Sequence, residues 1–180
     1  MIPAHALEFP DPQAAPILEK LIQKYNVKSV IEIGSFIGQT AVFFAKHTQI
    51  EKVICIDPFK AEGDWARDLE ARGIPNPFYC VFEENLRRRG LLHKIEAIRA
   101  KSSGVAVRDL PEVDMLFIDG DHSYEGCLSD IKLYAYKAKL VCGDDYHTDE
   151  NGVPYFPGVR RAVQQMFPAH EYEEGTWWAD

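Results

Sequence analysis

The sequence predicts an α/β protein built on a doubly wound, mostly parallel sheet. Short apolar runs alternate with helical patterns along the chain, as in proteins with parallel sheets. The stretch 30–45 shows one such unit: a short apolar strand, a loop that contains Gly34 and Gly38, and a buried helix. In addition, acids close four of the five main strand runs. Ligands bind at the carboxyl ends of the strands in sheets of this kind.

The composition is that of an ordinary globular protein. With 180 residues, 46% of them hydrophobic and 27% charged, the chain (1–180) is expected to form one domain. The formal net charge of −8 argues against a nucleic-acid partner, which requires a basic surface. The four cysteines form no C-x-x-C pair and indicate free thiols in the cytoplasm. We find no signal peptide and no apolar run of about 20 residues, so no membrane association is expected.

The elements follow from the apolar patterns. Residues 1–12 are proline-punctuated and are expected to form an N-terminal arm. A first helix is predicted where Leu18, Leu21, Ile22 and Tyr25 recur at helical spacing. The predicted strands and helices are as follows: strands at 27–33, 53–56, 95–100, 113–118 and 139–142; further helices at 40–46, 78–89, around 128–135 and 159–167; and short antiparallel edge strands at 171–172 and 176–178.

Two loops are candidates for substrate recognition. The polar stretch 59–77 is an insertion in which Asp64 and Gly73 are expected to bound a short helix that carries Trp65. The loop 148–157 is rich in Gly and Pro. Loops of this kind vary freely on a fixed scaffold, so they do not reveal the substrate.

Polar residues gather where the strands end. The carboxyl ends of parallel strands meet at one edge of the sheet, so several carboxylates are expected to converge there. They would repel one another unless a cation or a donor-rich ligand is bound. These end residues are Glu32, Asp57, Ser102, Asp119, Asp144 and Asp145.

The first loop indicates which ligand is bound. Its pattern, Glu32-x-Gly34-x-x-x-Gly38, is not the tight G-x-G-x-x-G loop that holds a pyrophosphate. S-adenosylmethionine fits better, because its ribose hydroxyls suit an acid at the end of the second strand, which is Asp57. Its ammonium and sulfonium groups also suit an acidic rim.

Four motifs together carry a family resemblance. They are the stretch 30–41, Ile56-Asp57-Pro58, the stretch 117–125 that contains Asp119-Gly-Asp-His122, and Gly143-Asp-Asp-Tyr146. In this order and at strand ends, they resemble class I S-adenosylmethionine-dependent methyltransferases over about residues 15–165. The similarity is greatest to the metal-dependent O-methyltransferase branch, which includes catechol-type and macrolide-sugar-type enzymes. The resemblance implies a seven-stranded, Rossmann-like methyltransferase sheet with an antiparallel C-terminal edge.

The resemblance also implies roles for individual residues. Asp57 would hold the ribose hydroxyls, Ser102 would lie by the adenine amine, and Asp119 would serve both the methionine end and a metal. With Asp144 and Asp145, Asp119 would form a Mg²⁺ site. The methionine side would be lined by Glu32, Gly34, Ser35, Phe36, Gly38 and Thr40.

Two positions depart from the catechol-type pattern. The last ligand pair is Asp144-Asp145 rather than Asp-Asn, and His122 stands where catechol-type enzymes have a lysine. In this respect the sequence resembles the sugar-type enzymes, which have a histidine at this place. The resemblance favours a saccharide or an alcohol as the substrate. We therefore expect methyl transfer to a hydroxyl group of a small molecule, with His122 as the base.

Plainer interpretations stay open on the sequence alone. Asp144-Asp145 could form only a turn, His122 could be an exposed turn residue, and Ser102 could cap a helix. The alternatives for function are a metal-independent methyltransferase that acts on another atom and a non-catalytic S-adenosylmethionine-binding module. A homodimer could complete the substrate pocket.

Overall fold

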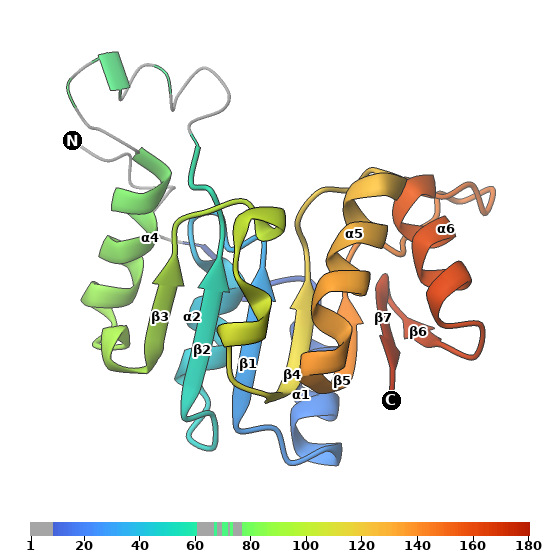
Figure 1. Ribbon diagram of the computed structural model, residues 1–180, viewed down its shortest axis with the longest axis horizontal. Coiled ribbons are helices and arrows are strands. Elements are labelled where there is room, and N and C mark those ends of the chain that lie inside the picture. The colour runs from blue at the N-terminus through green and yellow to red at the C-terminus, as the bar shows by residue number, and fades with distance from the viewer. Residues whose placement is uncertain (1–8, 61–66, 68–69, 72, 74–76) are drawn as a thin grey trace.

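The computed structural model describes residues 9–60, 67, 70–71, 73 and 77–180. Its centre is a seven-stranded sheet of order β3-β2-β1-β4-β5-β7-β6, with helices on both faces (Figure 1). The first five strands are parallel, and β7 and β6 form an antiparallel edge, as predicted. The strands are β1 (Ser29–Ile33), β2 (Lys52–Ile56), β3 (Ile95–Ile98), β4 (Val113–Ile118), β5 (Ala138–Gly143), β6 (Glu171–Glu173) and β7 (Thr176–Ala179).

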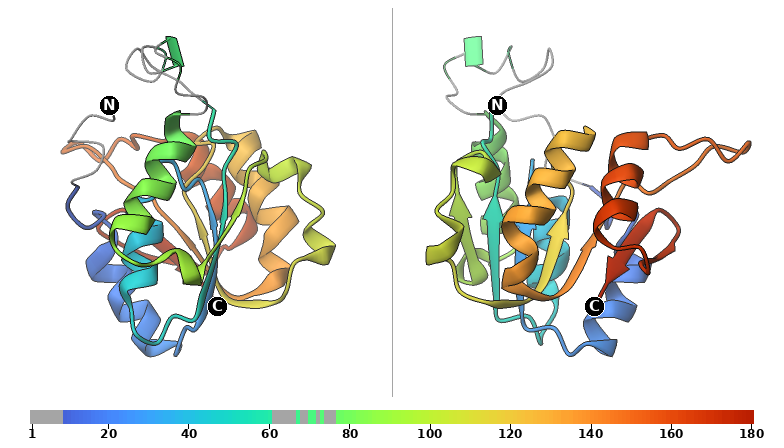
Figure 2. Two further views of the ribbon diagram at one scale, coloured as in Figure 1. Left: turned by 90° about the vertical axis from the view of Figure 1, so that its left-hand side faces the viewer. Right: turned by 45° about the vertical axis from the view of Figure 1, so that its right-hand side comes forward.

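The helices form two layers that enclose the sheet (Figure 2). One layer contains α1 (Ala15–Lys24), α2 (Gln39–Lys46) and α4 (Pro77–Arg88). The other contains α5 (Tyr124–Tyr134) and α6 (Pro157–Met166). Short 3₁₀ turns occur at Leu92–Lys94, Ser102–Gly104, Val107–Asp109 and Ala135–Lys137. Among the described residues, no helix is long and apolar enough to cross a membrane.

Local sequence signals account for the helix boundaries. Pro16 lies in the first turn of α1, where its missing N–H costs nothing. The Ser123 hydroxyl accepts a 3.0 Å hydrogen bond from the Gly126 N–H and so caps α5. In α6, the apolar stripe Val159, Ala162 and Val163 is buried against the sheet.

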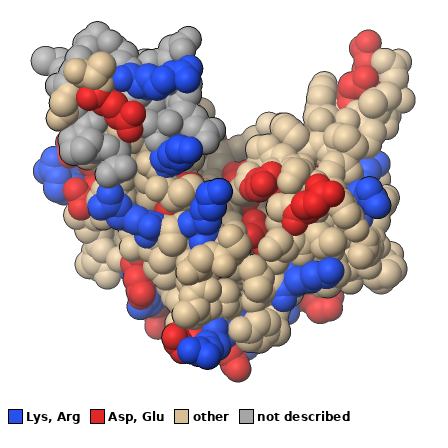
Figure 3. Space-filling model, turned by 45° about the horizontal axis from the view of Figure 1, so that its top comes forward, with Lys and Arg blue, Asp and Glu red and all other residues tan. Residues whose placement is uncertain are grey.

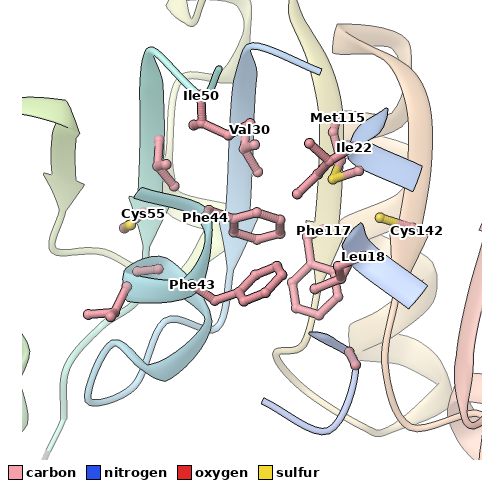
Figure 4. Packing of buried hydrophobic residues seen from close by; sticks show 14 of the residues in the cluster. Leu18, Ile22, Val30, Phe43, Phe44, Ile50, Cys55, Met115, Phe117 and Cys142 are labelled. Carbon is pink, nitrogen blue, oxygen red and sulfur yellow. The ribbon is translucent and has the colours of Figure 1, made fainter. Parts of the chain in front are cut away.

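The core consists of two apolar layers because side chains alternate along each strand. Val30 and Phe117 face α1 and α2, whereas Ile31 and Leu116 face α5 and α6. Figure 4 shows the first layer, in which the rings of Phe44 and Phe117 meet edge to face at 5.7 Å. Truncating either ring to alanine would cost about 3–5 kcal/mol of folding free energy.

Two strand boundaries differ from the predicted ones by two residues, and the others differ by one residue at most. β1 begins at Ser29 rather than residue 27, because the Asp114 carboxylate accepts hydrogen bonds from the N–H groups of Lys28 and Ser29. β3 ends at Ile98 rather than residue 100, because the N–H of Ala100 turns back to the carbonyl of Ile98. The helix predicted between Asp64 and Gly73, with Trp65, falls largely outside the described residues, as does most of the N-terminal arm.

Candidate active site at the carboxyl ends of the strands

The strand register brings the predicted site residues to one edge of the sheet. Ile33 of β1 pairs with both Ile56 of β2 and Ile118 of β4, and Ile118 pairs with Gly143 of β5. The loops that follow these four strands therefore begin side by side. Figure 3 shows this end of the molecule, where several acidic side chains gather near the middle of the face.

The loop after β1 requires glycine at two positions. Gly34 has a φ of +93°, and a Cβ there would lie 1.9 Å from the carbonyl oxygen of Asp119. Gly38 has a φ of +89°, and a Cβ would lie 2.9 Å from the ring of Phe82. Gly34 thus lets the loop lie against the end of β4, and Gly38 lets the start of α2 lie against α4.

Phe36 lies between these glycines in a left-handed conformation with a φ of +45°. Its N–H donates a 2.9 Å hydrogen bond to Asp57, and its ring contacts the edge of Phe78 at 4.6 Å. The side chain is nevertheless 46% exposed, which is unusual for a large apolar group beside a polar loop. A left-handed, exposed aromatic residue at a strand end is typical of a ligand-contacting position.

The Asp57 carboxylate connects the loops after β1 and β2. One oxygen accepts the N–H of Phe36, and the other accepts the N–H of Phe59 at 2.5 Å. A carboxylate oxygen can accept more than one hydrogen bond, so Asp57 is a residue of the kind that binds a hydroxyl group of a ligand. The two backbone contacts fix the orientation of the carboxylate.

Glu32 is a fully buried acid directly below this loop. Ser35 Oγ donates a hydrogen bond to Glu32 Oε2, whereas Oε1 has no hydrogen-bond partner among the described residues. Burial raises the pKa of Glu32 to about 8, because a carboxylate is poorly solvated there. Glu32 therefore holds a proton at neutral pH, unless a cationic ligand lies nearby.

Ser102 belongs to a different set of contacts. Its hydroxyl donates a 2.5 Å hydrogen bond to Asp130 Oδ1 and does not cap a helix. Its carbonyl oxygen accepts a 2.7 Å hydrogen bond from the hydroxyl group of Tyr134. Asp130 is buried, which raises its pKa to about 6. We did not predict Asp130, although an acid next to Ile131 on the apolar face of α5 was a usable signal. The Ser102 loop is fixed by α5.

Asp119, His122 and Asp145 form a cluster at the ends of β4 and β5. His122 Nε2 lies 2.7 Å from Asp145 Oδ2 and 3.8 Å from Asp119 Oδ1. One ligand atom from each of the three residues lies within 4.8 Å of the other two. Asp145 has a φ of +66°, and such strained conformations occur preferentially at functional sites.

The two carboxylates determine the charge of His122. The nearby carboxylates of Asp119 and Asp145 raise its pKa to about 10, so the imidazole is protonated at neutral pH. Desolvation in turn raises the pKa of Asp119. The imidazolium is thus the counter-charge of the acid pair in the protein alone.

Asp144 lies next to this cluster but is not a member of it. Its Oδ1 lies 3.5 Å from His147 Nε2 and has no hydrogen-bond partner within the described part of the chain. Burial, followed by the nearby charge of Asp119, raises the pKa of Asp144. Of the three predicted metal ligands, the structure brings Asp119 and Asp145 together and adds His122, while Asp144 is directed toward His147.

The donor set suits a divalent cation. Carboxylate oxygens are the ligands that Mg²⁺ prefers, and an imidazole nitrogen extends the choice to Mn²⁺ and similar ions. The unpartnered Oδ1 of Asp144 is a further acceptor beside the cluster. Asp119 and Asp145 are the residues that would hold the ion.

Comparison with known proteins identifies the family. Residues 31–143 match the family model described as a methyltransferase domain, so the chain belongs to this family. A curated relative, "Uncharacterized protein R132" of Acanthamoeba polyphaga mimivirus, is 27% identical over 165 residues. The match covers 83% of this chain and 66% of the relative, so the chain spans just under two thirds of that protein.

Solved structures show the same fold. The cofactor-bound Rv0187 from MTB has a TM-score of 0.65 and 17% identity, with 94% of this chain and 80% of that chain covered. The O-methyltransferase TomG from Streptomyces achromogenes, in complex with SAM, has a TM-score of 0.61 and 15% identity, with 96% and 80% covered. The O-methyltransferase from Bacillus cereus, in complex with SAH, has a TM-score of 0.58 and 15% identity, with 98% and 82% covered. The predicted Rossmann-like methyltransferase fold is confirmed.

Proposed function

We propose that the protein transfers a methyl group from S-adenosylmethionine to a hydroxyl oxygen of a small molecule, with the help of a divalent cation. The observation that carries this proposal is the strand register. It aligns the end of β1, which precedes the Glu32–Gly38 loop, with the end of β4, which precedes Asp119 and His122. A methyl donor and a hydroxyl group would therefore meet at the ends of adjacent strands.

The residues of the first two loops suit the donor. Asp57 presents two oxygens that can accept ribose hydroxyls, held in place by the N–H groups of Phe36 and Phe59. The buried Glu32 lies under the methionine side, where a sulfonium or ammonium group favours its ionised form. The loop itself lacks the tight glycine pattern of phosphate-binding loops. These features favour S-adenosylmethionine over a dinucleotide.

The second cluster suits activation of a hydroxyl group. A divalent cation at Asp119 and Asp145 would lower the pKa of a bound hydroxyl. A cation held by these carboxylates would weaken their stabilisation of the His122 imidazolium, and Nε2 of the neutral imidazole would then be available to accept a proton. His122 then removes the hydroxyl proton, and the loops orient the oxygen toward the methyl group.

The test combines binding with turnover. Calorimetric titration with S-adenosylhomocysteine should show one site per chain. Methyl transfer from labelled S-adenosylmethionine to a library of sugars, polyols and phenols should require Mg²⁺ and stop with EDTA. Binding without transfer to any acceptor would instead favour a non-catalytic module.

One observation favours a second candidate, a metal-independent methyltransferase. The imidazolium of His122 already neutralises charge on Asp119 and Asp145, so the acids can coexist without a cation. In that case turnover would persist in EDTA, and the cluster would serve to position the acceptor. The EDTA experiment therefore distinguishes the two candidates.

A further inference from the structure

A hollow of about 610 Å³ lies between the loop that follows β5, the start of α6 and the turn that joins β6 to β7. Its volume is that of a typical small-molecule site. Its wall includes Tyr146 and His147, the two residues that follow Asp145 in the chain, and His147 Nε2 lies 3.5 Å from Asp144 Oδ1. The lining residues are Gln13, Tyr146, His147, Thr148, Gly152, Arg160, Tyr172, Glu174 and Gly175.

Arg160 is the cation of this hollow. Its guanidinium carbon lies 4.4 Å from the ring centre of Tyr146 and 5.8 Å from that of Tyr172. Stacking on these rings fixes the plane of the guanidinium and leaves its N–H groups for in-plane partners. Among the described residues, Arg160 forms no ion pair, and its buried Nε has no hydrogen-bond partner. The one hydrogen bond that it forms within the described ranges is long, at 3.4 Å from a terminal nitrogen to the Tyr146 carbonyl oxygen.

In the described part of the chain Arg160 shares the lack of an acidic partner with Arg99 and Arg161, which stack on Tyr79 and Tyr124. It differs from them because it lines the hollow and because its buried Nε has no hydrogen-bond partner among the described residues. Arg87 and Arg88, by contrast, both pair with Glu84. Glu174 also lines the hollow, but it is exposed on the β6–β7 turn, whereas Arg160 is half-buried. Because charges interact more strongly where water is partly excluded, Arg160 dominates recognition of a bound group.

We propose that this hollow binds the methyl acceptor and that Arg160 recognises a carboxylate or phosphate group on it. The acceptor is then an anionic hydroxyl compound. Tyr172, which is 57% exposed, supplies an apolar wall. The inference rests on the proposed methyltransferase function, which it refines by naming the acceptor class.

The test compares matched probes in calorimetric titrations with Mg²⁺, both with and without S-adenosylhomocysteine. The carboxylate pair is 3,4-dihydroxybenzoate and 3,4-dihydroxybenzyl alcohol; the phosphate pair is glucose 6-phosphate and glucose. At least one anionic probe should bind about tenfold more tightly than its neutral partner, as expected for a charge-assisted hydrogen bond to arginine. The pair that shows the preference identifies the anionic group.

Two variants separate recognition by Arg160 from general charge effects. Arg160→Gln should abolish the preference while leaving the affinity for S-adenosylhomocysteine unchanged. Arg161→Gln is the control: it removes one positive charge from the same helix and one stacked arginine, which lies 4.0 Å from the Tyr124 ring and does not line the hollow. It should keep the preference.

Equal binding of anionic and neutral probes by the wild type would overturn the inference. So would equal loss in both variants, or no binding of any anionic probe by protein that binds S-adenosylhomocysteine. Failure to bind S-adenosylhomocysteine would instead refute the methyltransferase proposal, and the titrations without it would still test Arg160.

Discussion

Replacing Glu32 with glutamine should change how stability depends on pH. The unfolded chain releases the Glu32 proton near pH 4.5, whereas burial raises the folded-state pKa to about 8. Between these values the folded protein binds one more proton than the unfolded chain, so the free energy of unfolding falls as pH rises. Glutamine has nearly the same shape, keeps an oxygen acceptor for Ser35 and does not titrate.

The size of the effect follows from the two pKa values. The free energy of unfolding changes by about 1.4 kcal/mol per pH unit between the two pKa values and by less close to either of them. From pH 4.5 to pH 7 it therefore falls by about 3 kcal/mol. Relative to the wild type, Glu32→Gln should therefore gain about 3 kcal/mol of stability between pH 5 and pH 7.5. Other buried acids titrate alike in both proteins, so their contributions cancel in the difference.

Urea unfolding of the cofactor-free protein, followed by the fluorescence of the buried Trp177, measures the effect. Glu51→Gln is the control, because Glu51 is 73% exposed and its only ion pair with a described residue is a 3.9 Å surface contact with Lys28. Parallel pH profiles for the wild type and Glu32→Gln would show that Glu32 is not the buried, protonated acid described above.

Three further substitutions test the site. Gly34→Ala should lower the free energy of unfolding by more than about 2 kcal/mol, since its Cβ would clash with the Asp119 carbonyl in a left-handed backbone; unchanged urea unfolding would contradict this close approach. Asp57→Asn should weaken binding of S-adenosylhomocysteine about tenfold in calorimetry and lower Tm, since one of the two backbone N–H groups loses its acceptor, whereas unaltered affinity would remove Asp57 from the ribose site. His122→Ala should abolish turnover but keep the affinity for S-adenosylhomocysteine, and full activity with intact Mg²⁺ dependence would exclude His122 as the base.

The fold was predictable because its signals are local. The alternation of apolar runs and the glycines after the first strand lie within short windows, and the resulting order of elements allows few sheet topologies. The edge strands β6 and β7 could be placed for the same reason. The boundary of β1 could not, because it depends on Asp114, which lies 85 residues from Ser29 in the chain.

The chemistry of the site was only partly predictable because it arises between distant segments. The sequence indicated Asp119, His122 and Asp145, but the high pKa of His122 depends on how Asp145 approaches it. Asp144 and Asp145 are neighbours in sequence, but their side chains contact different histidines: Asp145 contacts His122, and Asp144 contacts His147. The backbone at Asp145 is left-handed. Sequence alone could not distinguish their roles.

The most direct test of the proposed function is a crystal structure of the protein with S-adenosylhomocysteine and Mn²⁺, in which the anomalous signal locates the ion. We expect the ribose hydroxyls on Asp57, the homocysteine end beside the Glu32–Gly38 loop, and a manganese peak that contacts Asp119 and Asp145. A nucleoside bound away from the ends of β1 and β2, or no nucleoside at saturating concentration, would contradict the proposal.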